Sequence, residues 1–305
     1  MQASVMEWFE SLPTWGKAAA VGGAVLAASL PVYLVTKRPR PSPYKSDWKQ
    51  GVVYLYQVPR FSTIPSASPY CLKLETWLRM ADITYENVDV PMSVRSREGL
   101  VPFVELNGVE YPDSGLAIRD LTKLLGKEAM EAHLNDEQKS ASRAFEKMIE
   151  HSTMWTYGLI RYVEKFDEFA ELFPPFLGPL QPFLVWMMKR GIRSGVAQRI
   201  KAAGIGTHPR DEIINIGLED LRAVSNYLGN KHYLTGYKPT RVDATLFGFL
   251  AQVVYMPIAS PHNDLIQQEC TNLKEYCDRI KGRFWPDWNE CTQKRSLHTE
   301  WKKRI

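Results

Sequence analysis

The distribution of apolar positions divides the chain into three regions. An apolar stretch lies near the N-terminus, short β-branched and aromatic runs follow, and from Asn135 onward the pattern is helical. Strands are predicted at residues 52–58, 83–90, 101–106 and 109–111, the last two joined by a tight turn at Asn107-Gly108. The chain therefore holds an α/β region followed by a helical region.

Two helices are predicted within the α/β region. Ser68 is suited to cap the first, with Pro69 at its first helical position. Asp113-Ser114 begins the second, which runs to about Leu125 and ends at Gly126. The apolar face of the first helix carries Cys71, Leu74 and Leu78.

The helical region contains two capping signatures. Asn135 is predicted to cap its first helix, and Thr240 with Asp243 three positions later has the spacing of a capping box. We expect the Thr240–Asp243 pair to be structural, because it satisfies main-chain N–H groups at a helix start.

The apolar N-terminal stretch is predicted to be a membrane anchor. Ala18 to Val35 contains no charged residue over 18 positions, which is the lower limit for a helix that spans a bilayer. A cleaved signal peptide would have a basic leading region, whereas Glu7 and Glu10 precede this segment. A core helix would be amphipathic, and this one is apolar on every side.

Basic residues behind the anchor predict a single-pass protein with most of the chain in the cytosol. Only Lys17 precedes the anchor, and the residues that follow it include Lys37, Arg38, Arg40, Lys45 and Lys49. The same pattern suits the endomembrane system and the mitochondrial outer membrane. Three prolines between residues 36 and 50 predict an extended linker.

Composition excludes several functions. The net charge of +4 over 305 residues is too small for a nucleic-acid-binding surface. The four cysteines form no C-x-x-C pair and no zinc-site spacing, so no metal is expected. We expect free thiols in a reducing compartment at Cys71, Cys270, Cys277 and Cys291.

Several motifs resemble those of the thioredoxin-like superfamily. Ser68-Pro69-Tyr70-Cys71 resembles the glutaredoxin C-P-Y-C motif with serine at the nucleophile position, and Val101-Pro102 is similar to the cis-proline before the third strand. Asp113-Ser114 resembles the acidic-serine pair that holds the γ-glutamyl end of glutathione in glutathione transferases, and Thr240 to Asp243 is similar to the box at the start of their core helix.

The stretch from about Val52 to Trp288 resembles the failed axon connections family, which is related to the metaxins within the glutathione S-transferase superfamily. The resemblance is carried by residues 68–81, 204–206, 243–248 and 284–288. It implies a membrane-associated protein of animal cells, in a family named for a role in axon formation.

The resemblance implies a glutathione S-transferase fold, an α/β thioredoxin-like domain followed by an all-α domain, behind a single transmembrane helix. The expected organisation is an N-terminal segment at 1–17, the anchor at 18–35, the Pro-rich basic linker at 36–50, the thioredoxin-like domain at 51–127, the helical domain at 135–290 and a C-terminal tail at 291–305.

The resemblance also implies a glutathione site, with glutathione as a ligand or cosubstrate. Ser68 is the candidate catalytic residue, because an alcohol can hydrogen-bond a thiolate and the helix N-terminus adds positive partial charge. Val101 and Pro102 would contact the cysteinyl part of glutathione, and Asp113 and Ser114 its amino and carboxylate ends.

Two further interpretations apply to the same residues. Tyr56, at the end of the first strand, is a second catalytic candidate ranked below Ser68, because the loop 59–67 separates it from the helix. Alternatively, Ser68 and Ser114 are only helix caps. Cys71 is predicted to be a core residue.

Two functions of different classes remain open. The first is a membrane-tethered interaction or adaptor protein, and the second is a glutathione-dependent transferase that detoxifies hydrophobic electrophiles. Possible partners are the membrane, other proteins and a second copy of the chain. Trp155, Tyr157 and Tyr162 lie in the helix that would line the second-substrate side, and aromatics at such spacing are more often core than pocket residues. Residues 183–188 are predicted to be either a second membrane contact or a buried helix with a basic end.

Overall fold

The computed structural model describes residues 8–17, 19–20, 23, 43–91, 94–174 and 181–304. The chain divides into two compact units, Met1–Tyr44 and Lys45–Ile305. Nearly all of the predicted anchor at 18–35 lies outside the described residues. Among the residues that are described, no helix has both the length and the apolar character needed to cross a bilayer.

The second unit begins earlier than predicted. The main-chain N–H of Lys45 donates to Glu105 Oε2 at 3.1 Å, and that of Lys49 donates to the hydroxyl of Tyr54 at 2.9 Å. The last residues of the predicted linker therefore belong to the fold, because their main-chain donors are satisfied on the strands.

A four-stranded sheet with the order β2-β1-β3-β4 forms the base of this unit. Its strands are β1 (Val53–Tyr56), β2 (Tyr85–Asn87), β3 (Phe103–Leu106) and β4 (Val109–Pro112). β1 pairs in parallel with β2 and antiparallel with β3, which pairs antiparallel with β4. β2 is shorter than the predicted 83–90, because only three of its residues pair with β1.

The helices of the α/β region begin where the sequence predicts. α3 (Pro69–Met80) starts after Ser68, whose hydroxyl accepts from the N–H of Cys71 at 3.4 Å. α4 (Ser114–Leu124) starts after Asp113. The turn before β4 has positive φ at both Asn107 and Gly108, as such hairpins require.

The helical domain follows a short 3₁₀ turn, η1 (Glu128–Met130). Its elements are α5 (Asp136–Met148), η2 (Ile149–Thr153), α6 (Met154–Gly158), η3 (Leu159–Glu164), α7 (Phe166–Glu171), α8 (Gln181–Ala202), η5 (Ile205–Thr207), α9 (Arg210–Leu228), α10 (Arg241–Tyr255), α11 (Pro261–Gln268), α12 (Thr271–Phe284), α13 (Trp288–Thr292) and η6 (Trp301–Arg304). η2 and η3 are π-helical turns within a helical run from α5 to η3. Such turns often accompany functional sites.

The predicted caps of the helical domain are present. The side chains of Asn135 and Gln138 form a capping box at the start of α5. At the start of α10, the carboxylate of Asp243 accepts from the N–H of Thr240 at 2.7 Å and from Tyr276 Oη at 2.8 Å. Burial raises the pKa of Asp243, although these hydrogen bonds act in the opposite direction.

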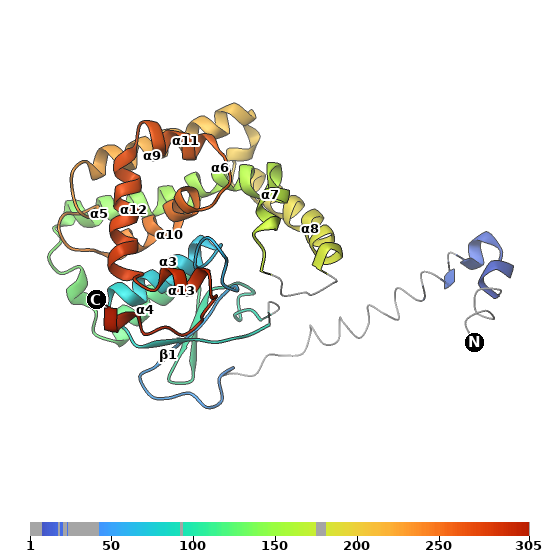
Figure 1. The fold of residues 1–305 in the computed structure, drawn as a ribbon, viewed down its shortest axis with the longest axis horizontal. Coiled ribbons are helices and arrows are strands. Elements are labelled where there is room, and N and C mark those ends of the chain that lie inside the picture. Colours follow the sequence, from blue (N-terminus) through green and yellow to red (C-terminus); the bar gives the residue numbers. More distant parts are fainter. Residues whose placement is uncertain are drawn as a thin grey trace. The chain divides into compact units, whose positions relative to one another are not determined.

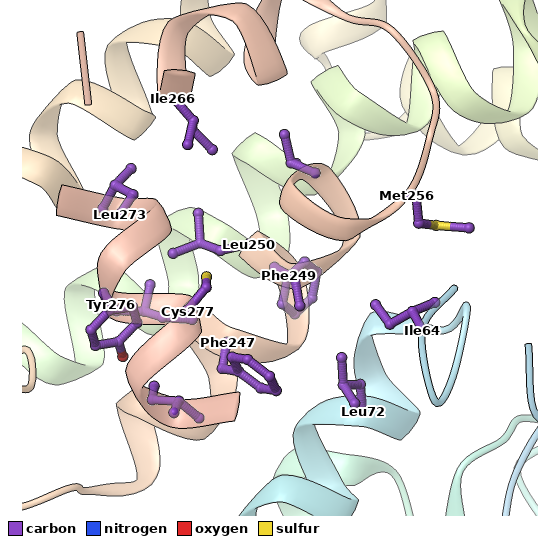
Figure 2. Close-up of a cluster of buried hydrophobic side chains, with 14 of the residues drawn as sticks. Ile64, Leu72, Phe247, Phe249, Leu250, Met256, Ile266, Leu273, Tyr276 and Cys277 are labelled. Carbon is purple, nitrogen blue, oxygen red and sulfur yellow. The ribbon is translucent and has the colours of Figure 1, made fainter. Parts of the chain in front are cut away.

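The largest hydrophobic core belongs to the helical domain but reaches into the α/β domain. Figure 2 shows Leu250 of α10 and Leu273 of α12 in this core, with Leu72 of α3 and Ile64 of the preceding loop on the side of Phe249 and Met256. α3 therefore lies between the sheet and the helices of the second domain (Figure 1).

Gly248 permits the close approach of α10 to α3. A Cβ atom at this position would lie 2.6 Å from the carbonyl oxygen of Pro69 and 2.9 Å from the main-chain nitrogen of Lys73. Both are backbone atoms, which cannot move aside as the end of a flexible side chain can. The contact between the two domains therefore requires a residue without a side chain here.

The segment predicted as a C-terminal tail, 291–305, is packed against the α/β domain. The side-chain amide of Asn87 donates to the carbonyl of Leu297 at 3.0 Å, and Lys302 pairs with Asp82 at 2.6 Å. Trp301 is buried. These contacts cover the edge strand β2, which would otherwise be open to pairing.

Candidate functional site

Four residues predicted to bind glutathione lie together around one cavity. Val101, Pro102, Asp113 and Ser114 line a space of about 350 Å³, and the Val101–Pro102 peptide bond is cis as predicted. The other residues that line this cavity are Tyr70, Leu100, Gly115, Lys147, Glu150, His151, Trp155 and Arg199.

Asp113 holds a strained backbone conformation at the mouth of this cavity. Its φ of 61° and ψ of 134° lie outside the regions that L-residues ordinarily occupy. The conformation is held because the carboxylate accepts from the N–H groups of Gly115 and Leu116 at 2.8 and 2.9 Å. Strain of this kind, maintained by surrounding structure, is typical of binding sites.

Ser114 offers a hydroxyl to a ligand. The residue is 3% exposed and lines the cavity, and its hydroxyl has no hydrogen-bond partner within the described part of the chain. The hydroxyl is not one of the fully enclosed side-chain atoms that lack a partner among the described residues, so it remains accessible from the cavity. It can therefore hydrogen-bond water or a ligand there.

A buried lysine pairs with Glu150, one of the residues that line the cavity. Lys73 of α3 is fully buried, and its ammonium contacts Glu146 at 3.1 Å and Glu150 at 2.7 Å. Burial disfavours ionisation of Glu150, but Lys73 and Lys147 together hold its pKa below the usual range. Because Glu150 belongs to the π turn η2, the turn places its carboxylate between the cavity and α3.

The cavity has both signs of charge. Asp113 and Glu150 supply carboxylates, and Lys147 and Arg199 supply cations. Lys147 pairs with Glu150 at 2.8 Å, whereas no carboxylate pairs with Arg199 among the described residues. A zwitterionic peptide such as glutathione, which carries one ammonium and two carboxylates, needs such a mixture.

Ser68 lies in a second, apolar cavity. Ser68 and Tyr162 supply hydroxyls to a space of about 160 Å³, and its other lining residues are Val58, Pro59, Phe61, Ala67, Phe169, Phe173, Met188 and Ile192. The lining residues of the two cavities have no member in common. The candidate thiol-stabilising residue therefore lines a different cavity from the residues predicted to hold the peptide.

Tyr70 lies between the polar cavity and the hydrophobic core. It lines the polar cavity, and its ring meets that of Phe249 edge-on at 5.2 Å. Burial raises the pKa of its hydroxyl, and the neighbouring Glu150, Tyr162 and Asp113 add to this effect, so Tyr70 remains a neutral phenol.

Tyr56 has no access to either cavity. It is fully buried, its ring stacks on Phe103 at 4.4 Å and its hydroxyl donates to Glu105 at 2.7 Å. The hydroxyl of Tyr56 therefore cannot reach a ligand in either cavity, and Tyr56 is not a catalytic candidate.

The thiols are enclosed, as expected. Cys71 is fully buried, and burial raises the pKa of its thiol. Burial also raises the pKa of Cys291, to about 12. Neither thiol is therefore placed to act as a thiolate.

Two of the three aromatic residues expected on the second-substrate side line cavities, and sequence reasoning missed several other lining residues. Tyr157 is buried as predicted, but Trp155 and Tyr162 are half-buried and line the polar and the apolar cavity respectively. Two π turns shift the helical register here, so a regular helical spacing could not place them. The cavity-lining residues that no motif pointed to include Lys147, Glu150, His151 and Arg199.

Comparisons with known families agree with this architecture. Residues 69–167 match the family described as glutathione S-transferase N-terminal domain, and residues 217–280 match the family described as glutathione S-transferase, C-terminal domain. A solved glutathione S-transferase of Ceriporiopsis subvermispora is 14% identical, with a TM-score of 0.51, and the match covers 76% of this chain and 97% of that one. At this identity the likeness supports the fold alone.

Among curated proteins, "Failed axon connections" of Drosophila melanogaster is 34% identical over 84% of this chain. The match spans 63% of that protein's own length, so it does not extend to the whole relative. "Isoprene-epoxide--glutathione S-transferase" of a Rhodococcus strain is 25% identical over 72% of this chain and 94% of its own. "Metaxin-2" of Mus musculus is 22% identical over 80% and 92% respectively.

Proposed function

Since this chain belongs to the failed axon connections family, a metaxin-related branch of the glutathione S-transferase superfamily, we propose that it is a membrane-tethered interaction protein rather than an enzyme. The transferase fold would serve as a scaffold that presents surfaces to protein partners. A second copy of the chain is one possible partner. Its role would lie in the development of cells or axons or in the response to stress.

One observation carries the non-catalytic part of this proposal. Catalysis by a serine requires the sulfur of glutathione to lie beside Ser68 while Asp113 and Ser114 hold the γ-glutamyl end. Ser68 and this pair line separate cavities. The hydroxyl of Ser68 also has a structural use, since it caps α3.

A conjugation assay tests this proposal. We expect purified Lys45–Ile305 with glutathione and 1-chloro-2,4-dinitrobenzene to react no faster than the uncatalysed mixture, with Ser68→Ala the same. Conjugation above background that is lost in Ser68→Ala would overturn the proposal and assign Ser68 the role of thiol-stabilising residue.

A glutathione-dependent transferase acting on hydrophobic electrophiles is the second candidate. The unpaired Ser114 hydroxyl at a cavity with charges of both signs supports it, as does the similarity to a transferase whose name specifies an epoxide substrate. Titration calorimetry with glutathione separates the cases. Binding in the millimolar range or tighter that Ser114→Ala weakens but Ser140→Ala, at an exposed position of α5, does not would establish a working glutathione site.

The membrane tether is a separate part of the proposal. The apolar segment 18–35 and the basic residues after it support a single-pass anchor with the second unit in the cytosol, in the endomembrane system or the mitochondrial outer membrane. Full-length protein should stay with membranes after alkaline carbonate extraction, and a chain starting at Lys45 should be released. Release of both forms would exclude an integral anchor.

A further inference from the structure

Helix α8 carries positive charge without any negative charge. Residues 181–202 contain no aspartate or glutamate, and the cations are Lys189, Arg190, Arg193, Arg199 and Lys201. Lys189 pairs with Asp167 of α7 at 2.6 Å. Within the described part of the chain, neither Arg190 nor Arg193 is paired with a carboxylate, so α8 keeps most of its charge uncompensated.

One face of α8 combines these cations with large apolar side chains. Positions 186, 190, 193, 197 and 201 recur at helical spacing and are all exposed. Trp186 is 61% exposed and the adjacent Met187 is 51% exposed. The buried-helix interpretation of residues 183–188 is therefore wrong for these two side chains.

The opposite face of α8 attaches the helix to the fold. Met188 and Ile192 line the apolar cavity beside Phe169 and Phe173. Arg190 and Arg193 are not among the residues that line this cavity.

We propose that the exposed face of α8, defined by Trp186, Met187, Arg190, Arg193 and Lys201, docks on an anionic lipid bilayer. Tryptophan inserts at the boundary between headgroups and acyl chains, where its ring is apolar and its N–H remains hydrated. Each exposed cation is attracted to the negative surface potential of an anionic leaflet. A helix that presents both along one face, with no acidic residue to oppose them, suits a lipid surface.

This contact is independent of the N-terminal anchor and of any glutathione site. It would hold the second unit against the membrane, whereas the anchor alone would only tether it. Lys45–Ile305 forms a compact unit that includes both hydrophobic cores, so it can be tested without the anchor.

Co-sedimentation with vesicles tests the proposal. We expect Lys45–Ile305 to bind phosphatidylcholine vesicles that contain about one third phosphatidylserine, and to bind pure phosphatidylcholine at least tenfold more weakly. Arg190→Glu/Arg193→Glu and Trp186→Ser/Met187→Ser should each weaken binding at least tenfold. Raising the salt from about 0.1 M to 0.5 M should weaken the wild type further.

A matched variant controls for net charge. Lys123→Glu/Lys139→Glu changes the charge by the same amount at two exposed positions on α4 and α5, and it should bind like the wild type. Equal loss in this variant would overturn the proposal, because binding would then depend on total charge. Absence of wild-type binding to the vesicles would also overturn the proposal. In that case, a dimer that Trp186→Ser/Met187→Ser dissociates would assign the face to contact with a second copy of the chain. Unchanged melting temperatures confirm that the variants are folded.

Discussion

The guanidinium of Arg79 and the carboxylate of Asp287 form a two-point ion pair in the interior, with N–O distances of 2.5 and 2.9 Å. Arg79 lies on α3 of the α/β domain, and Asp287 caps α13 in the helical domain. The guanidinium also lies 3.7 Å from the ring centroid of Trp285. One side chain thus joins the two domains through charge, hydrogen bonds and an aromatic face.

Loss of this pair should strongly destabilise the protein. Arg79→Met leaves the carboxylate of Asp287 buried without its partner, and such changes cost about 3–5 kcal/mol. Urea unfolding should show the decrease. Arg119→Met, which removes an exposed partner of Asp120, should leave the free energy of unfolding unchanged. An equally small effect of Arg79→Met would mean that Asp287 finds compensation elsewhere.

His262 should make stability depend on pH. Thr156 already donates its hydroxyl proton to Thr153 O, so Nε2 of His262 is the donor to Thr156 Oγ1 at 2.8 Å. Nδ1 has no partner among the described residues, and burial lowers the pKa of His262 to about 4. The folded state therefore favours the neutral ring.

The lowered pKa of His262 determines the direction in which stability changes with pH. Because the unfolded chain binds the proton near pH 6.5, the contribution of His262 is complete above that pH and is lost as the pH falls toward 4. The loss amounts to about 3 kcal/mol across this window. Chemical unfolding at several pH values should show a slope that His262→Gln reduces. An unchanged slope in the variant would mean that other titratable groups cause the pH dependence of stability.

Gly248→Ala should destabilise the contact between the domains. The added methyl group would lie less than 3 Å from main-chain atoms of α3, so the helices must separate, at a cost of several kcal/mol. Gly282 of α12 is an exposed helical control with no atom within 4 Å of an added Cβ. Gly282→Ala should raise stability by about 0.5–1 kcal/mol. Equal effects of the two substitutions would contradict the close packing of α3 and α10.

The native thiols should react slowly. Cys71, Cys270, Cys277 and Cys291 are all free and buried. Ellman's reagent should label none of them quickly in the native protein and all four after denaturation in guanidinium, because unfolding exposes them. Fast labelling of Cys71 in the native protein would reopen a thiol-based activity at the N-terminus of α3.

The sequence by itself determined the features that depend on neighbouring residues. Ser68 and Asp113 cap their helices, Asn107-Gly108 turns the hairpin, and Thr240 with Asp243 forms its capping box. Each is decided by main-chain geometry within a few residues, so the local pattern is sufficient. The resemblance of these motifs to those of glutathione transferases then implied the transferase fold.

Only the tertiary structure decided which polar residues are buried and which cavities exist. Lys73 and Arg79 are charged residues that the sequence alone would place in solvent, yet both are buried, and Arg79 pairs with Asp287, 208 positions away. The same long-range packing places Ser68 in one cavity and Ser114 in another. Such pairings depend on how separate elements meet in space, and the spacing of residues along the chain does not encode them.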